Sequence, residues 1–253
     1  MILICGPCVI DSLNDLRIDA CEISAMADKY SLDLYFKASC IKDNRTNLKN
    51  YSGPGFTIGI QYLEEVKKQY GMKITTDFHT VEQIEVYANR VDLIQIPAFL
   101  AMQTSLINAA IKIGKPIHIK KPQWLPPYDV SNPVSKVKDQ SKDIEVFMTD
   151  RGTTFGYGNV MVDPRHIKKM KTSDCDKVIV DITHPQNHSE IYSADYAEQL
   201  GMASIAAGAD GLFIESTYNP MIAKCDGDSM IPTGQLYHYL NKFTKLYRFI
   251  KNG

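Results

Sequence analysis

The sequence contains no apolar stretch that reaches the length of about 20 residues needed for a membrane-spanning helix. A basic segment of the secretory type is also missing at its start, because Met1 leads directly into a short apolar run. Neither sign of charge is in excess, since 28 Lys and Arg residues accompany 29 Asp and Glu residues. We therefore expect a cytoplasmic protein with no membrane and no nucleic-acid partner.

The chain contains six cysteines, but their spacing shows no framework of a small disulfide-rich domain. Cys5 and Cys8 form a C-x-x-C pair, and no second pair completes the spacing of a zinc ribbon. A nucleotide-binding loop is absent as well, because Gly53-Pro54-Gly55 is not followed by Gly-Lys-Ser/Thr and indicates a turn. Disulfide scaffolds, zinc ribbons and P-loop proteins are thereby excluded.

The chain does contain a regular alternation of short apolar runs, polar turns and amphipathic stretches. Eight runs predict strands: Ile2–Cys5, Leu34–Ser39, Lys73–Asp77, Leu93–Ile96, Pro116–Lys120, Glu145–Thr149, Val178–Asp181 and Gly211–Glu215. Helical periodicity is found between them, for instance in Ile18–Tyr30, Gly59–Tyr70 and Tyr196–Ala207. With 253 residues, the chain has the size of one eight-unit barrel.

This alternation predicts the α/β class and a single-domain (β/α)8 TIM barrel that spans residues 1–253. A doubly wound open sheet is the alternative, because the number of strands does not prove that the sheet closes. The C-terminal segment Gln235–Ile250 has the periodicity of a helix. Its apolar stripe predicts core packing: Tyr237, Leu240, Phe243, Leu246 and Tyr247.

Chemically useful side chains follow every predicted strand. In chain order they are Cys8; Lys37, Ser39, Lys42, Asn44 and Arg45; Asp77 and His79; Gln95, before Pro97-Ala98-Phe99; His118 and Lys120; Asp150 and Arg151; Asp181 and His184; and Glu215. In a (β/α)8 barrel the C-terminal ends of the strands share one face, and active sites lie there. We therefore expect an active site at this face.

Cations are prominent among these side chains: Lys37, Lys42, Arg45, Lys120 and Arg151. Such a cluster suits a substrate that carries phosphate and carboxylate groups. The structural alternative is a set of ion pairs with the aspartates of the same face: Asp77, Asp150 and Asp181. A lysine that points into a barrel without an anion is costly, which favours the substrate interpretation.

Four further residues could bind a metal: Cys8, His184, Glu215 and Asp226. A thiolate together with an imidazole and two carboxylates suits a borderline divalent ion such as Zn, Fe or Mn. The four are far apart in the sequence, and a single cysteine is more often a small buried apolar residue. From the residues alone, both interpretations stay open.

Motifs along nearly the whole chain resemble those of the 3-deoxy-D-manno-octulosonate 8-phosphate synthases. They occur in the order Gly6-Pro7-Cys8, Phe36-Lys37-Ala38-Ser39, Lys42-Asp43-Asn44-Arg45, Thr76-Asp77-Phe78-His79, Gln95-Ile96-Pro97-Ala98-Phe99-Leu100, Lys120-Lys121-Pro122-Gln123, Asp150-Arg151-Gly152, Phe155-Gly156-Tyr157, Asp181-Ile182-Thr183-His184 and Lys224-Cys225-Asp226-Gly227. So many collinear motifs are far more specific than any single one.

The resemblance implies condensation of phosphoenolpyruvate with arabinose 5-phosphate and release of inorganic phosphate, in lipopolysaccharide sugar biosynthesis, by a homotetramer. For phosphoenolpyruvate, it implies that the phosphate is bound at Lys120, Arg151, Ala98 and Phe99 and that the carboxylate lies near Lys37 and Lys42. For the sugar phosphate, it implies Asn44, Arg45 and Thr46. Further substrate-binding positions within the same motifs are Ser39, Gln95 and Gln123. The implied catalytic residues are Lys42, Asp77, His79 and His184, of which the last three are candidate proton relays.

Cys8, His184, Glu215 and Asp226 match the metal ligands of the metal-dependent branch of that family. The metal-independent branch has an asparagine where this chain has Cys8, so the resemblance implies a divalent metal cofactor. The pair Asp226-Gly227 is more similar to the metal-independent branch.

Two positions depart from the family pattern. Met102 stands where the family has an arginine that reaches the sugar phosphate of a neighbouring subunit, and the segment 185–195 is shorter than the family's loop and lacks its Gly-rich stretch. These departures indicate a different aldose or aldose phosphate acceptor as the alternative. An acceptor such as erythrose 4-phosphate is disfavoured by the Lys42–Arg45 motif. A non-catalytic sugar-phosphate-binding barrel is disfavoured by the metal set.

Overall fold

Eight parallel strands form a closed barrel in the computed structural model, which describes residues 1–45, 47, 49–154, 160–186 and 196–252. The strands are β1 Ile2–Gly6, β2 Asp33–Lys37, β3 Lys73–Asp77, β4 Leu93–Ile96, β5 Ile117–Lys120, β6 Val146–Asp150, β7 Lys177–Asp181 and β8 Gly211–Thr217. β1 pairs with β8 from Ile2 opposite Gly211 to Gly6 opposite Glu215. This pairing closes the sheet, which confirms the predicted TIM barrel and excludes the open sheet.

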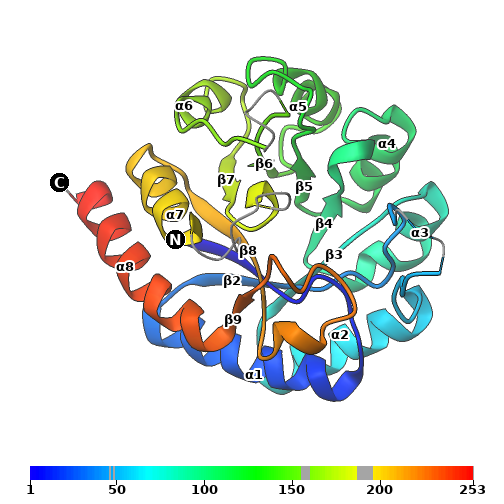
Figure 1. Cartoon of the computed structure of the whole chain (residues 1–253). Coiled ribbons are helices and arrows are strands. Elements are labelled where there is room, and N and C mark those ends of the chain that lie inside the picture. The colour runs from blue at the N-terminus through cyan, green and yellow to red at the C-terminus, as the bar shows by residue number, and fades with distance from the viewer. Residues whose placement is uncertain (46, 48, 155–159, 187–195, 253) are drawn as a thin grey trace.

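The helices surround the barrel on its outer side (Figure 1). They are α1 Leu13–Tyr30, α2 Phe56–Tyr70, α3 Val81–Tyr87, α4 Thr104–Ile113, α5 Ser131–Lys138, α6 Arg165–Met170, α7 Ala197–Ala206 and α8 Thr233–Asn252. α8 lies between α7 and α1 and completes the ring. A ninth strand, β9 Ile231–Pro232, pairs with the end of β8 and was not predicted from the sequence. No helix in the described ranges has both the length and the apolar character needed to cross a bilayer.

Each strand separates two apolar layers, because successive side chains point to opposite faces. In β1, Ile2 and Ile4 belong to a cluster inside the barrel, whereas Leu3 and Cys5 pack towards the helices. The inner cluster also receives one side chain from each of five other strands: Tyr35, Leu93, Phe147, Ile179 and Phe213. Both faces of the strands are therefore buried, which explains why the strands are continuous apolar runs in the sequence.

The same alternation of side chains along the strands determines where the polar residues at the strand ends lie. Two positions after each inward-pointing apolar residue, the following side chain also points inward and is polar. In this way Lys37 follows Tyr35, Gln95 follows Leu93, Asp181 follows Ile179 and Glu215 follows Phe213. In the parallel registers Asp77 lies opposite Gln95, so it shares their face. The polar groups form the upper layer of the barrel interior.

Two of the differences from the sequence-based expectation concern the end of β2 and the apolar stripe of α8. β2 ends at Lys37 rather than Ser39, which instead forms an isolated bridge with Val9. On α8, Leu240 and Phe243 are fully buried, but Tyr237 is 43% exposed, so the prediction that it packs in the core was wrong. Tyr237 instead lies against Tyr30 of α1, with 5.7 Å between the ring centroids. The apolar stripe extends beyond the surface that the neighbouring helices cover.

Gly6 is expected to be essential for the stability of the barrel next to Cys8. Its φ is +154°, and a Cβ added there would lie 2.2 Å from the carbonyl oxygen of Lys37. Gly6→Ala should therefore lower the free energy of unfolding by about 3 kcal/mol. Gly71→Ala is the matched control, because its φ is +67° and nothing lies within 4 Å of the added Cβ. It should cost about 1 kcal/mol. Equal losses in urea titrations would contradict the proposed steric role.

Candidate active site

The polar strand ends line one cleft of about 290 Å³ at the C-terminal face of the barrel. Its lining comprises Lys37, Lys42, Asn44, Arg45, Asp77, Gln95, Pro97, Ala98, Phe99, Lys120, Arg151, His184, Glu215, Cys225 and Asp226. Most of the residues singled out in the sequence are thus brought together, although their roles in binding stay predictions. Ser39, His79 and Gln123 are not part of this lining, and Thr46 lies outside the described residues.

Glu215 is the anionic centre of the cleft. Its side chain is only 1% exposed, and its Oε1 lies 3.5 Å from Lys37 Nζ and 3.9 Å from Lys42 Nζ. Burial would raise the pKa of this carboxyl, but the charges of His184 and the two lysines outweigh burial and lower the pKa to about 2. Glu215 is therefore a carboxylate at neutral pH and offsets the buried lysines.

A second buried pair joins β5 to β7. Lys120 Nζ lies 2.8 Å from Asp181 Oδ2 and 3.5 Å from the centre of the Phe213 ring. Burial lowers the pKa of Lys120 to about 8, because the charge of Asp181 only partly offsets the loss of solvent. The ion-pair alternative drawn from the sequence is thus realised for this lysine.

Asp150, a further candidate partner of the cations, pairs with a different lysine. Its Oδ1 lies 3.3 Å from Nζ of the fully buried Lys121. Lys121 also donates to three carbonyls in the loops after β5 and β6, including that of Gly152 at 3.0 Å. This network stabilises the backbone of the two loops. Lys121 does not line the cleft, so the cations that line it are other residues.

Two expected site residues outside the lining orient residues within it. Lys37 Nζ donates to Ser39 Oγ at 2.8 Å and to the Cys8 carbonyl at 3.1 Å, so Ser39 fixes the position of the amine. His79 Nε2 lies 3.3 Å from Asp77 Oδ2, and the His79 ring stacks on Phe99. Burial opposes ionisation of Asp77, but Lys37 and the hydrogen bond from His79 hold its pKa well below the usual range.

Arg45 connects two loops of the site. Its guanidinium donates to the carbonyl of Tyr51 from Nε at 2.9 Å and from Nη2 at 2.7 Å, and to the carbonyl of Lys224 at 3.2 Å. The Lys224 amine lies 4.4 Å from the centre of the Tyr51 ring. The loop after β2 is thus tied to the loop after β8, which carries Asp226.

The four residues expected to bind a metal fall into two groups that share Asp226, and Cys8 itself does not line the cleft. Donor atoms of His184, Glu215 and Asp226 lie within 4.8 Å of one another, and Asp226 belongs to a second such group that includes Cys8. Cys8 Sγ lies 3.0 Å from Asp226 Oδ2. Asp226 has a φ of +50°, a left-handed conformation that aspartate tolerates.

The chemistry of this donor set fits a divalent cation. Both carboxylate oxygens of Glu215 are buried without a hydrogen-bond partner in the described part of the chain. Burial lowers the pKa of His184, which favours the loss of the proton that coordination by an imidazole requires. Burial also raises the pKa of the Cys8 thiol well above its usual value, so a metal ion would have to displace its proton.

Cys225 is the residue that sequence reasoning missed. Its Sγ lies 2.9 Å from Cys8 Sγ, and it completes the group of Cys8 and Asp226. The signal is present in the motif Lys224-Cys225-Asp226-Gly227, in which Cys225 directly precedes the expected ligand Asp226.

Comparisons with known proteins agree with this architecture. The model of the DAHP synthetase I family matches residues 1–252. The 2-dehydro-3-deoxyphosphooctonate aldolase of Helicobacter hepaticus is 39% identical over 252 residues, covering 93% of this chain and 93% of that protein. The enzyme of the same name from Desulfotalea psychrophila is 37% identical, over 97% of this chain and 89% of that protein.

A third relative of the same name, from Campylobacter jejuni, is 37% identical over 270 residues, covering 100% of this chain and 98% of that protein. The similarity thus extends over the complete barrel and includes every loop that contributes to the cleft. The chain belongs to the DAHP synthetase I family.

Proposed function

We propose that the protein is a 2-dehydro-3-deoxyphosphooctonate aldolase that works in the direction of synthesis. In this direction it condenses phosphoenolpyruvate with arabinose 5-phosphate. The products are 3-deoxy-D-manno-octulosonate 8-phosphate, a precursor of lipopolysaccharide, and inorganic phosphate. The observation that carries the proposal is the convergence of Lys37, Lys42, Lys120 and Arg151 with a group of potential metal ligands in one cleft. The names of the full-length relatives support the same activity.

The cations of the cleft would bind the two anionic reactants. Lys120 and Arg151, with the backbone at Ala98 and Phe99, are proposed to bind the phosphate of phosphoenolpyruvate, and Lys37 and Lys42 its carboxylate. Asn44 and Arg45, which line the cleft, and Thr46 are proposed for the sugar phosphate on the basis of the family resemblance. Fixing both reactants removes much of the orientational entropy from the barrier.

In the reaction, C3 of the enol attacks the aldehyde carbon of the sugar while water adds at C2, and the resulting tetrahedral species loses phosphate. Asp77, His79 and His184 are the candidates for moving the protons of these steps, because the Asp77–His79 contact keeps one imidazole oriented near the cleft. A divalent cation held by Cys8, His184, Glu215 and Asp226 would supply Lewis-acid polarisation of the aldehyde or activation of the water.

We place the protein in the metal-dependent branch, with Zn, Fe or Mn as cofactor. The close approach of Cys8 to Asp226 and the unbonded oxygens of Glu215 support this assignment. A cytoplasmic location, a single catalytic domain of residues 1–253 and a homotetrameric assembly belong to the same proposal, on the basis of the family resemblance.

The direct test is phosphate release from phosphoenolpyruvate and arabinose 5-phosphate before and after treatment with a chelator. We expect activity that the chelator abolishes and that a divalent ion restores. Activity that resists the chelator would support the proposed synthase reaction but contradict the proposed role of the metal. If metal-loaded protein released no phosphate with any aldose phosphate, the proposed reaction would be wrong.

A different aldose acceptor is the second candidate function, and Met102 is the observation that favours it. Met102 is partly buried against the outer core and does not line the cleft, and its carbonyl accepts a hydrogen bond from Lys136 at 2.8 Å. No charge at this position is available for a sugar phosphate. Turnover with a panel of aldoses, with and without a terminal phosphate, would decide. A large preference for arabinose 5-phosphate would eliminate the alternative.

The activity is expected to fall at alkaline pH because of Lys120. With a pKa of about 8 in the free protein, its ammonium form predominates below that pH and is lost above it. Since kcat/KM reports groups of the free enzyme, kcat/KM for phosphoenolpyruvate should decline as the pH rises through about 8. In Lys120→Arg the decline should move to higher pH, because a guanidinium stays charged. An identical alkaline decline in both proteins would assign it to another group.

A further inference from the structure

Cys225 forms a close sulfur pair with Cys8. The Sγ atoms are 2.9 Å apart, and the two residues are 4% and 0% exposed. This separation is shorter than the roughly 3.5–4.0 Å at which even two carbon atoms make their best contact. The two sulfurs are therefore in direct contact, and a single cation beside them could be bound by both.

The position of Cys225 is compatible with such a shared cation. Its sulfur, that of Cys8 and a carboxylate oxygen of Asp226 lie within 4.8 Å of one another, and Asp226 equally approaches His184 and Glu215. Cys225 also lines the cleft in which the reactants are proposed to bind. Two thiolates at about 2.3 Å from one zinc ion lie about 3.8 Å apart at a tetrahedral angle, which the pair reaches by separating roughly 1 Å.

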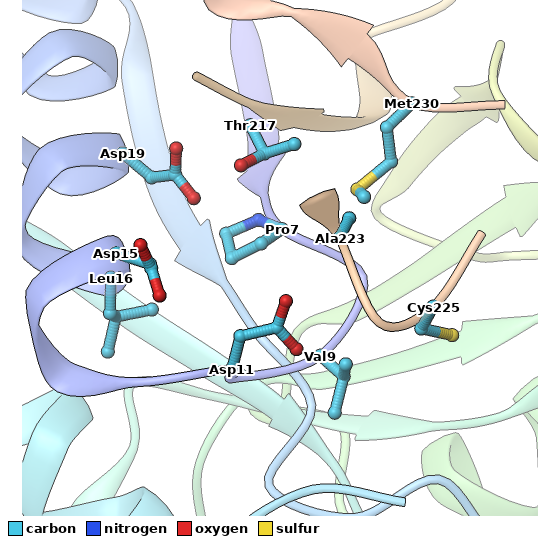
Figure 2. Close-up of a pocket in the computed structure, with 10 residues that line it drawn as sticks. All are labelled: Pro7, Val9, Asp11, Asp15, Leu16, Asp19, Thr217, Ala223, Cys225 and Met230. Atoms are coloured by element: carbon cyan, nitrogen blue, oxygen red, sulfur yellow. The ribbon is translucent and has the colours of Figure 1, made fainter. Parts of the chain in front are cut away.

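The backbone on either side of this pair is held in place. Asp11 accepts a hydrogen bond at 3.1 Å from the backbone N–H of Lys224, the residue before Cys225. The backbone N–H of Cys8 donates to Met230 Sδ at 3.3 Å. Figure 2 shows Asp11 and Met230 at the small cavity behind the loop, and the Cys225 thiol points away from the cavity's acidic side chains.

The acidic residues of that cavity have partners of their own. Asp19 accepts from the backbone N–H of Tyr218 at 2.7 Å, and Asp15 accepts from the Tyr218 hydroxyl at 2.7 Å. They therefore stabilise the loop after β8 and do not compete for the cation. The thiol of Cys225 is left facing Cys8.

We propose that Cys225 is a second thiolate ligand of the metal site, which gives the site two sulfur donors and a preference for thiophilic ions such as zinc over manganese. This inference rests on the metal site of the proposed function. On binding, two sulfur–metal bonds form, and each thiol releases its proton to water. A donor set with two thiolates is softer than one with a single thiolate, and softness favours zinc over oxygen-preferring ions.

Cobalt(II) added to metal-free, reduced protein without oxygen tests the inference, because each thiolate–cobalt bond contributes to a charge-transfer band in the near ultraviolet. We expect the band of the unmodified protein to be about twice as intense as that of Cys225→Ser or Cys8→Ser. Cys21→Ser is the matched control, since Cys21 is exposed on α1, and it should leave the band unchanged. Circular dichroism and a Cys225→Ala variant separate ligand loss from misfolding.

Metal competition gives a second readout. Cys225→Ser should weaken zinc binding at least about tenfold and change manganese binding far less. If Cys225→Ser kept the full band and the zinc affinity while Cys8→Ser lost them, Cys225 would be a bystander and the proposed metal site would stand. If the unmodified protein bound no cobalt, the metal site itself would be refuted, and this inference with it.

Discussion

Replacing Lys120 by methionine is expected to lower kcat/KM for phosphoenolpyruvate about 10³-fold, which corresponds to roughly 4 kcal/mol. Methionine retains the length and apolar character of the side chain but removes the buried ammonium that would face the substrate phosphate. The loss should appear mainly in kcat/KM for phosphoenolpyruvate, with a smaller change for the sugar. Steady-state kinetics with each substrate varied in turn measures both effects.

The control must account for Asp181, which Lys120 Nζ approaches to 2.8 Å. Removing the lysine leaves this carboxylate buried without its cation, which by itself destabilises the fold. The double variant Lys120→Met/Asp181→Asn should recover most of the stability but not the activity. If it recovered the activity as well, Lys120 would serve the fold and not the substrate.

Glu215→Gln is expected to abolish metal binding and to lower the free energy of unfolding by about 3–5 kcal/mol. The amide has the same shape but no charge, so Lys37 and Lys42 lose the anion that lies 3.5 Å and 3.9 Å from their amines. Metal content of the purified protein and chemical unfolding at neutral pH measure the two effects. A matched surface control is Glu65→Gln, which removes an ion pair with Arg17. Both side chains of this pair are about 40% exposed. It should cost less than about 1 kcal/mol.

The effect of Glu215→Gln should depend on pH with a definite sign. The pKa of Glu215 is lowered from 4.5 to about 2 in the folded protein, so its charge contributes stability that is fully present above about pH 4.5. That contribution is lost as the pH falls towards 2, because the carboxyl becomes protonated in the folded state as well. The stability difference between the two proteins should therefore shrink in acid. A constant difference would show that packing, not charge, causes the loss.

Much of the fold could be predicted because the signals are local. The predicted limits of the strands at Lys73–Asp77 and Leu93–Ile96 agree with the structure, since short β-branched or apolar runs bounded by turn residues are visible in any local window of the sequence. The expected helix Gly59–Tyr70 lies within α2, although α2 begins three residues earlier at Phe56, because Gly55 precedes its first turn without a side-chain cap. Ser39 was assigned to a strand because the pattern does not reveal where pairing stops.

The candidate site was predictable to the extent that it depends on strand ends. Lys37, Gln95 and Glu215 follow inward-pointing apolar residues by two positions, so their convergence follows from the strand period once the sheet is closed. The pairing of Lys120 with Asp181 could not be derived from the strand period, because it joins β5 to β7 across the barrel interior and depends on the tilt of the strands. Sequence patterns do not specify such distances.

By itself, the sequence determined the eight strand–helix units, the polar face and the family, because these depend on residue order and local periodicity. Tertiary structure decided that β1 pairs with β8, that Ser39 and His79 support the cleft instead of lining it, and that Cys225 meets Cys8. The first and the last of these depend on contacts between residues far apart in the chain; Cys8 and Cys225 are 217 positions apart. Such contacts form only when the closed barrel and the left-handed turn at Asp226 bring the loops together.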